Sequence, residues 1–165
     1  MTRKVLLGLL LCVVVVGGVW GVRWATRPSV QEVLADFHAA EGRAEDMLMD
    51  PLILNADLVA PAIVMGIKDP DMDKRRYAVA FLGIADIRDA LPVLRTILAD
   101  ATEKSTMRGD ALESTYRMER EAGLVLARKY TDQDGHLGHV ARGLTEGSWR
   151  LRTRTYWQAL VGYHE

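Results

Sequence analysis

Two stretches of this sequence, LVAPAIVMGIKD at residues 58–69 and DALPVLRTILAD at residues 89–100, match one another at a displacement of 31 positions. Both have the apolar spacing of a helix and both carry a proline, which a helix accepts most easily in its first turn. We therefore expect Pro92 in a first turn with Asp89 as N-cap, and Pro61 in the equivalent place. The matching positions are Pro61 with Pro92, Ile67 with Leu98 and Asp69 with Asp100.

A second pair of stretches follows these two. RRYAVAFLG at residues 75–83 is similar to REAGLVLAR at residues 120–128, with a displacement of 44 positions. The second copy would then contain a 13-residue insertion that includes the polar stretch ATEKSTMRGD. A fainter third copy is formed by HLGHVARGLTE, at residues 136–146, and RTYWQALVG, at residues 154–162. The pattern predicts a repeated unit of two helices, whose apolar faces are buried by stacking on neighbouring units.

This pattern resembles the HEAT repeat, in the short HEAT-like form named after phycobilisome lyases. The resemblance covers roughly residues 50–162 and is strongest over residues 57–100. It implies a short α-solenoid of about three helical hairpins, with an intra-repeat ion pair between Asp69 and Arg75. The positions of RRYAVAFLG that match the family pattern are Arg75, Ala78, Leu82 and Gly83.

The second copy departs from the family pattern. Glu119 stands at the arginine position and Ala127 at the glycine position, which argues against a continuous ladder of ion pairs. A generic helical bundle is the alternative fold.

The rest of the chain also has helical periodicity, and no stretch alternates as a strand would. We therefore predict an all-α fold. Residues 30–49 are expected to form one capping or spacer helix, and residues 50–165 the HEAT-like repeat domain. Further helices are expected near residues 58–68, 74–84, 90–99, 111–130, 137–144 and 149–161.

Residues 5–22 contain no charged side chain and follow a basic N-terminus at residues 1–4. Eighteen helical residues extend about 27 Å, close to the thickness of a bilayer core. We predict a single-pass signal-anchor in a bacterial inner membrane, followed by a linker at residues 23–29. The short basic N-terminus favours an exported C-terminal domain. The alternative is a cleaved signal peptide, although no A-x-A pattern follows the apolar run.

Gly17 and Gly21 form a G-x-x-x-G pair that would let two anchors pack closely as a homodimer. The alternative, which we prefer, is that glycine is simply common in membrane helices. Cys12 is the only cysteine and lies within the expected anchor, so the domain beyond it has no disulfide or thiol chemistry.

Charge and motif content argue against several function classes. From residue 30 onward, 17 lysines and arginines face 22 acidic residues, a net charge of −5 that is a poor match for nucleic-acid binding. No nucleotide-binding or hydrolase motif occurs. His136 and His139 are three residues apart, but no third ligand accompanies them, so we expect no metal and no cofactor.

The stretch SWRLRTRTYW, at residues 148–157, combines three arginines at every second position with aromatic residues on both sides of them. Such a pattern is found on surfaces that bind nucleic acids or anionic lipids. We prefer the alternative, a terminal helix whose aromatic side chains pack and whose arginines balance an acidic domain.

Together these features predict a membrane-anchored, non-catalytic helical-repeat module that binds a partner protein as a scaffold. The second helices of such solenoids line the concave face, so Arg76, Tyr77 and Arg120 are candidate partner contacts. The alternative function is an accessory factor, like the chromophore lyases, that holds a small ligand in the concave groove.

Overall fold

The computed structural model describes residues 27–41 and 44–163, and over these residues the chain is helical with no strand. The prediction of an all-α fold is confirmed. The elements are α2 (Val30–Ala39), η1 (Glu45–Met49), α3 (Asp50–Leu54), α4 (Ala56–Gly66), α5 (Arg75–Ile84), η2 (Arg88–Ala90), α6 (Leu91–Ala99), α7 (Ser105–Met118), α8 (Arg120–Ala127), α9 (Gly135–Glu146) and α10 (Tyr156–Val161).

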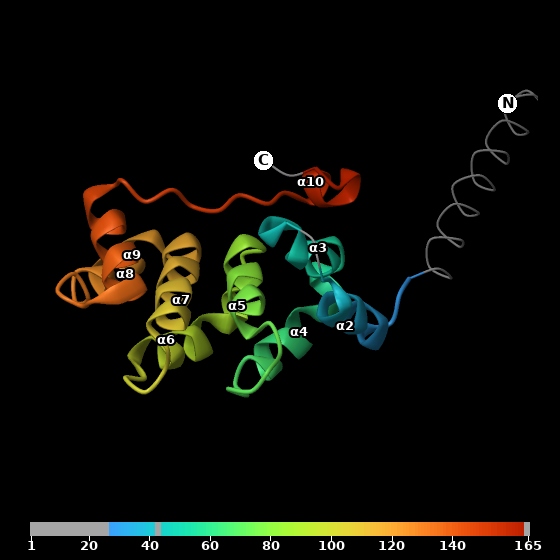
Figure 1. Cartoon of the computed structure of the whole chain (residues 1–165), viewed down its shortest axis with the longest axis horizontal. Helices are drawn as coiled ribbons and strands as arrows, with labels where there is room; N and C mark the ends of the chain where they lie inside the picture. The colour runs from blue at the N-terminus through green and yellow to red at the C-terminus, as the bar shows by residue number, and fades with distance from the viewer. Residues whose placement is uncertain (1–26, 42–43, 164–165) are drawn as a thin grey trace, which may run out of the picture.

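Successive helices pack in pairs, α4 with α5, α6 with α7 and α8 with α9. The second members of these pairs are neighbours in turn, because α7 packs against α5 on one side and against α9 on the other (Figure 1). The apolar core runs through the whole row, and its largest fully buried side chains include Phe37, Phe81, Leu94, Leu112 and Leu137.

The first two helix pairs share two local hydrogen-bond patterns. The carboxylate of Asp69 accepts the backbone N–H of Asp71, and that of Asp100 accepts the backbone N–H of Thr102. An arginine early in each second helix then donates Nε–H to a carbonyl at the end of the first helix. Arg75 binds the Ile67 carbonyl at 2.7 Å, and Arg108 binds the Leu98 carbonyl at 2.9 Å. Both bonds satisfy groups that a helix end leaves unpaired.

The second helices of the first two pairs align differently from the alignment that the sequence predicted. Arg108 takes the place of Arg75, so the second helix of the second pair is α7, which begins inside the stretch expected to be a polar insertion. The helix expected over residues 111–130 is broken at Glu119, whose φ of −137° and ψ of 82° are not helical. The segment REAGLVLAR is therefore the first helix of a third pair, α8 with α9.

The two prolines occupy different positions. Pro92 lies in the first turn of α6, as predicted, although Ala90 is the N-cap and Asp89 belongs to η2. Pro61 lies inside α4, whose N-cap is Asn55, and its expected first-turn position is wrong. Because Pro61 has no backbone N–H, the carbonyl of Asp57 lacks its helical hydrogen-bond donor. Pro61 and Asp57 are both exposed, so solvent can bind this carbonyl.

The single helix expected over residues 30–49 is also a wrong prediction. Helix α2 ends at Ala39, and the next described element is η1, which begins at Glu45. The ammonium group of Lys74 binds the last carbonyls of α2, those of Phe37, His38 and Ala40. Because a cation held there satisfies the end of the helix, α2 stops where it meets the α4–α5 connection.

Within the described part of the chain, no single helix has the length and apolar character to cross a membrane. The pair Glu45–Leu54 and Ala56–Gly66 meets those criteria only when taken together, and it is bent by 114°. The expected anchor at residues 5–22, with Gly17 and Gly21, lies outside the described residues.

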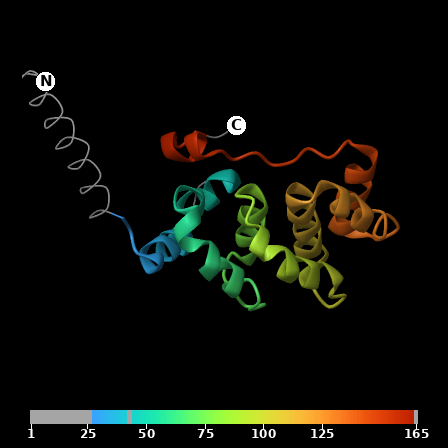
Figure 2. The ribbon, with the colours of Figure 1, turned by 180° about the vertical axis from the view of Figure 1, so that it is seen from behind.

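After α9 the chain returns along the whole row of helices. Residues 147–155, here termed the strap, contain no helix and run from the third pair back to α3, where α10 packs (Figures 1 and 2). Arg154 fixes the end of the strap by donating two hydrogen bonds to the carboxylate of Asp50, at 2.6 and 2.5 Å. It also donates to Asp46, at 3.2 Å, and to the Tyr163 carbonyl.

The Arg154–Asp50 pair is buried, with 4% and 5% of the two residues exposed. We expect Arg154→Met to lower the free energy of unfolding by roughly 3–5 kcal/mol, because it leaves the Asp50 carboxylate buried without a counter-charge. The measurement is urea unfolding of the full chain in detergent. The control is Arg150→Met, an exposed arginine of the same strap, which should change stability by less than about 0.5 kcal/mol. Equal effects of the two variants would contradict the anchoring role.

Helices α5 and α7 approach closely because Gly83 has no side chain. A Cβ atom at Gly83 would lie 2.7 Å from the Cα atom of Ser114, inside van der Waals contact with backbone. By contrast, a Cβ atom at Gly66 would meet only the flexible Met72 side chain, at 3.3 Å. The contact between α5 and α7 therefore requires a glycine, and the end of α4 does not.

We expect Gly83→Ala to destabilise the fold by about 1–3 kcal/mol, because α5 and α7 must separate to admit the methyl group. Gly66→Ala, as the matched control, should leave stability within about 1 kcal/mol of the original. Thermal unfolding followed by circular dichroism measures both. A Gly83→Ala protein as stable as its Gly66→Ala counterpart would show that the helices do not pack at this distance.

Candidate functional site: the polar face of α7

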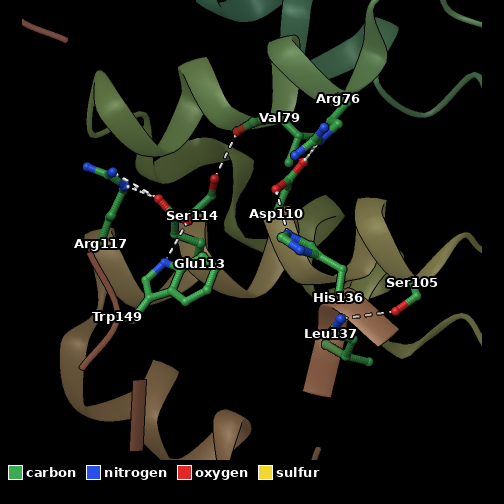
Figure 3. Close-up of polar contacts among 10 residues, drawn as sticks. All are labelled: Arg76, Val79, Ser105, Asp110, Glu113, Ser114, Arg117, His136, Leu137 and Trp149. Carbon is green, nitrogen blue, oxygen red and sulfur yellow. Dashed lines mark hydrogen bonds and ion pairs between the residues drawn. The ribbon is translucent and has the colours of Figure 1, made fainter. Parts of the chain in front are cut away.

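Four polar side chains of the central helix α7 are buried. They are Asp110, Glu113, Ser114 and Thr115, and the two acidic residues are 4% and 7% exposed. A helix packed between two others cannot turn such residues to solvent, so each needs a partner inside the protein. No buried side-chain nitrogen or oxygen in the described residues lacks one. Figure 3 shows the contacts of Asp110, Glu113 and Ser114.

Asp110 joins α7 to both neighbouring helices. It accepts a hydrogen bond from Arg76 Nε of α5 at 2.5 Å, and its other oxygen lies 3.4 Å from Nε2 of His136 on α9 (Figure 3). Burial by itself would lower the pKa of Arg76, but the hydrogen bond and negative charge of Asp110 raise it above its usual range. Arg76 therefore stays charged, so Asp110 forms an ion pair with α5 and a polar contact with His136 of α9.

Glu113 joins α7 to the strap. Its Oε1 accepts hydrogen bonds from Arg117 Nε and Nη2, at 3.1 and 2.9 Å, and its Oε2 accepts Nε1–H of Trp149 at 2.9 Å. Arg117 also donates to the backbone carbonyl of Arg152. The carboxylate and its arginine thus hold both Trp149 and the backbone of the strap, and Figure 3 shows the Arg117–Glu113–Trp149 part of this network.

The serine hydroxyl groups near this face form hydrogen bonds with backbone groups of neighbouring helices. Ser114 Oγ donates to the Val79 carbonyl of α5 at 2.9 Å, and Ser105 Oγ accepts the backbone N–H of Leu137 at 3.0 Å (Figure 3). Neither hydroxyl is hydrogen-bonded to His136, whose polar partner is Asp110. The arrangement holds helices and strap in register and does not pair a nucleophile with a base. Over the described residues, no cluster of three or more potential ligands is placed to hold a metal ion.

The candidate contact residues have different environments. Arg76 is half-buried and paired with Asp110, while Tyr77 donates its hydroxyl to Glu45 at 3.0 Å. Burial, and then this hydrogen bond, raise the pKa of Tyr77, which keeps the phenol neutral. Arg120 is exposed on α8 with its guanidinium 5.6 Å from the Tyr116 ring centroid. The structure thus places Arg76 and Tyr77 beside η1 and the strap, and Arg120 on another helix pair.

The expected ion pair between Asp69 and Arg75 is not formed. Arg75 pairs with Glu103, from the connection between α6 and α7, while the Asp69 carboxylate binds the backbone of its own turn. The arginine is drawn to the next pair of helices because its Nε is already bonded to the Ile67 carbonyl. This ion pair links neighbouring helix pairs and does not lie within one.

Two cavities lie where the strap crosses α5 and α7. The inner one, lined by Ala80, Asp110, Glu113 and Arg152 among others, has a volume of only about 10 Å³. A wider one of about 540 Å³ lies between η1, Ile84 and the strap, and its lining includes Glu45, Asp46, Arg150, Arg152 and Thr153. The face of the second helices is therefore filled by the strap, with space remaining at its edge.

Sequence reasoning missed the residues that form this face. Asp110 fell inside a stretch assigned to an insertion, and Glu113 was given no partner, because buried polar residues weaken the apolar periodicity of α7. The displacement of 33 between Arg75 and Arg108 was the signal that could have placed α7 correctly. Arg154 had no comparable signal, because its partner Asp50 lies 104 residues away.

Comparisons of this chain with protein-family models, with curated proteins and with solved structures found no match.

The importance of the α7 face can be tested by removing one charge. We expect Asp110→Asn to lower the free energy of unfolding by about 1.5–3 kcal/mol, because the buried hydrogen bond from Arg76 loses its charged acceptor. The control is Glu119→Gln, in the partly exposed Arg95–Glu119 pair, which should cost at most about 1 kcal/mol. Urea unfolding of the full chain in detergent compares the two, and a larger loss in Glu119→Gln would be inconsistent with this assignment.

Proposed function

We propose that this protein is a membrane-anchored, non-catalytic module that binds a partner protein on the face formed by α5, α7 and the strap. The helix pairs would constitute a short HEAT-like α-solenoid, and residues 5–22 would hold it at the bacterial inner membrane with the domain on the exported side. Fold alone does not determine function, so the proposal is argued from the surface itself.

The observation that carries the proposal is the strap. An extended length of polypeptide is already bound across this face, through its backbone at Arg152 and its side chains at Trp149 and Arg154. Recognition of an extended segment by backbone bonds and a few anchoring side chains is a common mode of protein–peptide binding. Arg150, exposed at the edge of the wider cavity, is available to extend the same surface. Glu45 and Asp46 at this edge are already bonded to Tyr77 and Arg154.

Two hydrogen-bond patterns that recur from one helix pair to the next support the proposed solenoid. The turns at Asp69 and Asp100, and the arginine bonds of Arg75 and Arg108, recur from the first helix pair to the second. In stacked repeats each unit is stabilised mainly by its neighbours. The Arg75–Glu103 pair is a contact of that kind, since it joins the first pair to the connection of the second.

One observation favours the second candidate function, binding of a small ligand by an accessory factor. The cavity of about 540 Å³ beside the strap is of the size that small-molecule sites have. The cavity of about 10 Å³ at the centre of the face is far too small. A ligand would therefore bind at the edge of the strap and not in the middle of the second-helix face.

A photo-reactive amino acid incorporated at Thr153 tests the proposed surface in native membranes. Thr153 is exposed on the strap, so we expect a discrete cross-linked species, whose protein component is identified by mass spectrometry. The matched control carries the same group at Met65, which is exposed on α4 and away from the strap. Identical adducts at both positions, or an adduct at Met65 alone, would contradict a partner site on this face.

A further inference from the structure

Helix α10 presents an uncharged, apolar stripe to solvent. Trp157 and Val161 are both 72% exposed, and Leu160 lies between them on the same side at helical spacing. Ala159, on the opposite side, is buried where α10 packs on α3. Residues 155–163 contain no charged side chain. The exposed large apolar side chains of this end are Tyr156, Trp157, Leu160, Val161 and Tyr163, here termed the α10 stripe.

The α10 stripe lies beside the point where the described structure begins. Arg27, Leu58 and Tyr156 line one cavity of about 450 Å³, so the start of the described chain and the start of α10 are neighbours. Figure 2 shows α10 at the same end of the molecule as α2. Five residue steps separate Arg27 from the end of the uncharged run at residues 5–22, a reach of at most about 18 Å. An anchor in residues 5–22 would therefore keep this stripe close to the bilayer.

The chemistry of the stripe fits the interfacial region of a bilayer. Tryptophan and tyrosine concentrate at that depth, where an apolar ring and a polar group are both accommodated. The two nearest arginines of the strap contribute little, because Arg154 is ion-paired with Asp50 and Arg152 is half-buried. Arg27 is exposed beside Tyr156 and can reach anionic headgroups. Insertion would thus depend mainly on apolar and aromatic area, with attraction to anionic headgroups as the smaller contribution.

We infer that the α10 stripe inserts into the interface of the same bilayer that residues 5–22 span, giving the domain a second membrane contact. The inference rests on the proposed anchoring of residues 5–22, and it assigns a lipid surface as the occupant of this apolar face. Two contacts at one end of the row would hold the helix pairs in a set orientation. The face of α5, α7 and the strap would then be presented at a constant distance from the membrane.

The test uses the full chain in vesicles of phosphatidylcholine and phosphatidylglycerol. Cys12 is replaced by serine, and an environment-sensitive fluorophore is attached to a cysteine introduced by Val161→Cys. We expect its emission to shift to shorter wavelength and to be quenched by lipids that carry a nitroxide on the acyl chain. The matched control is Val125→Cys, at an exposed valine of α8, which should show neither effect. Flotation of the vesicles reports separately whether the chain is anchored.

Three outcomes would overturn the inference. If the chain floats with the vesicles and the Val161 label behaves like the Val125 label, the anchor stands and the α10 contact is wrong. If the Val161 emission shifts without quenching by the lipid nitroxide, a second copy of the chain covers the stripe instead. If the chain does not float, the proposed anchoring fails and the α10 contact fails with it. High salt should leave the nitroxide quenching of the Val161 label unchanged. Loss of this quenching in high salt would indicate an electrostatic contact.

Discussion

The constraint on which the row of helices depends is the burial of two carboxylates on α7. Asp110 and Glu113 lie one helical turn apart in the middle of the protein, and neither reaches solvent. A buried, unpaired carboxylate costs several kcal/mol, so this helix is compatible only with neighbours that supply donors. Asp110 receives them from α5 and α9, and Glu113 from its own helix and the strap. Buried ion pairs add little net stability, but they select one arrangement of the helices among many apolar packings.

The strap also restricts how the two ends of the row of helices are arranged, because it runs from the third pair back to α3. Without it, each helix pair would contact mainly its neighbours, as in other linear arrays. Arg154 instead joins the C-terminal segment to Asp50, the first residue of α3, and its hydrogen bonds to Asp50 raise its own pKa. The C-terminal segment is thereby held against α3, and the exposed α10 lies next to Arg27. The placement of α10 depends on this buried arginine together with the packing of Ala159 on α3.

The sequence could predict those parts of the fold that depend on residues close together in the chain. Helical spacing identified the all-α fold, and the match between Pro61 and Pro92 led to the repeated first helices, although only Pro92 lies in a first turn. Helix α7 was misplaced because its buried face is polar, so apolar periodicity is weak where packing is most dense. The end of α2 was missed because its cause, Lys74, lies 34 residues or more along the chain. Contacts such as Arg154 with Asp50 depend on the tertiary fold and have no local signal.

The strength of the strap anchor decides how a partner would use this surface. Displacing the strap would separate Arg154 from Asp50 and would also remove the contacts of Trp149 and of the Arg152 carbonyl. A displacing partner would lose the free energy of all these contacts from its own affinity. A partner that binds beside the strap, along the edge formed by Glu45, Asp46 and Arg150, avoids this loss. The energetics therefore favour a surface in which the strap is itself part of the binding site.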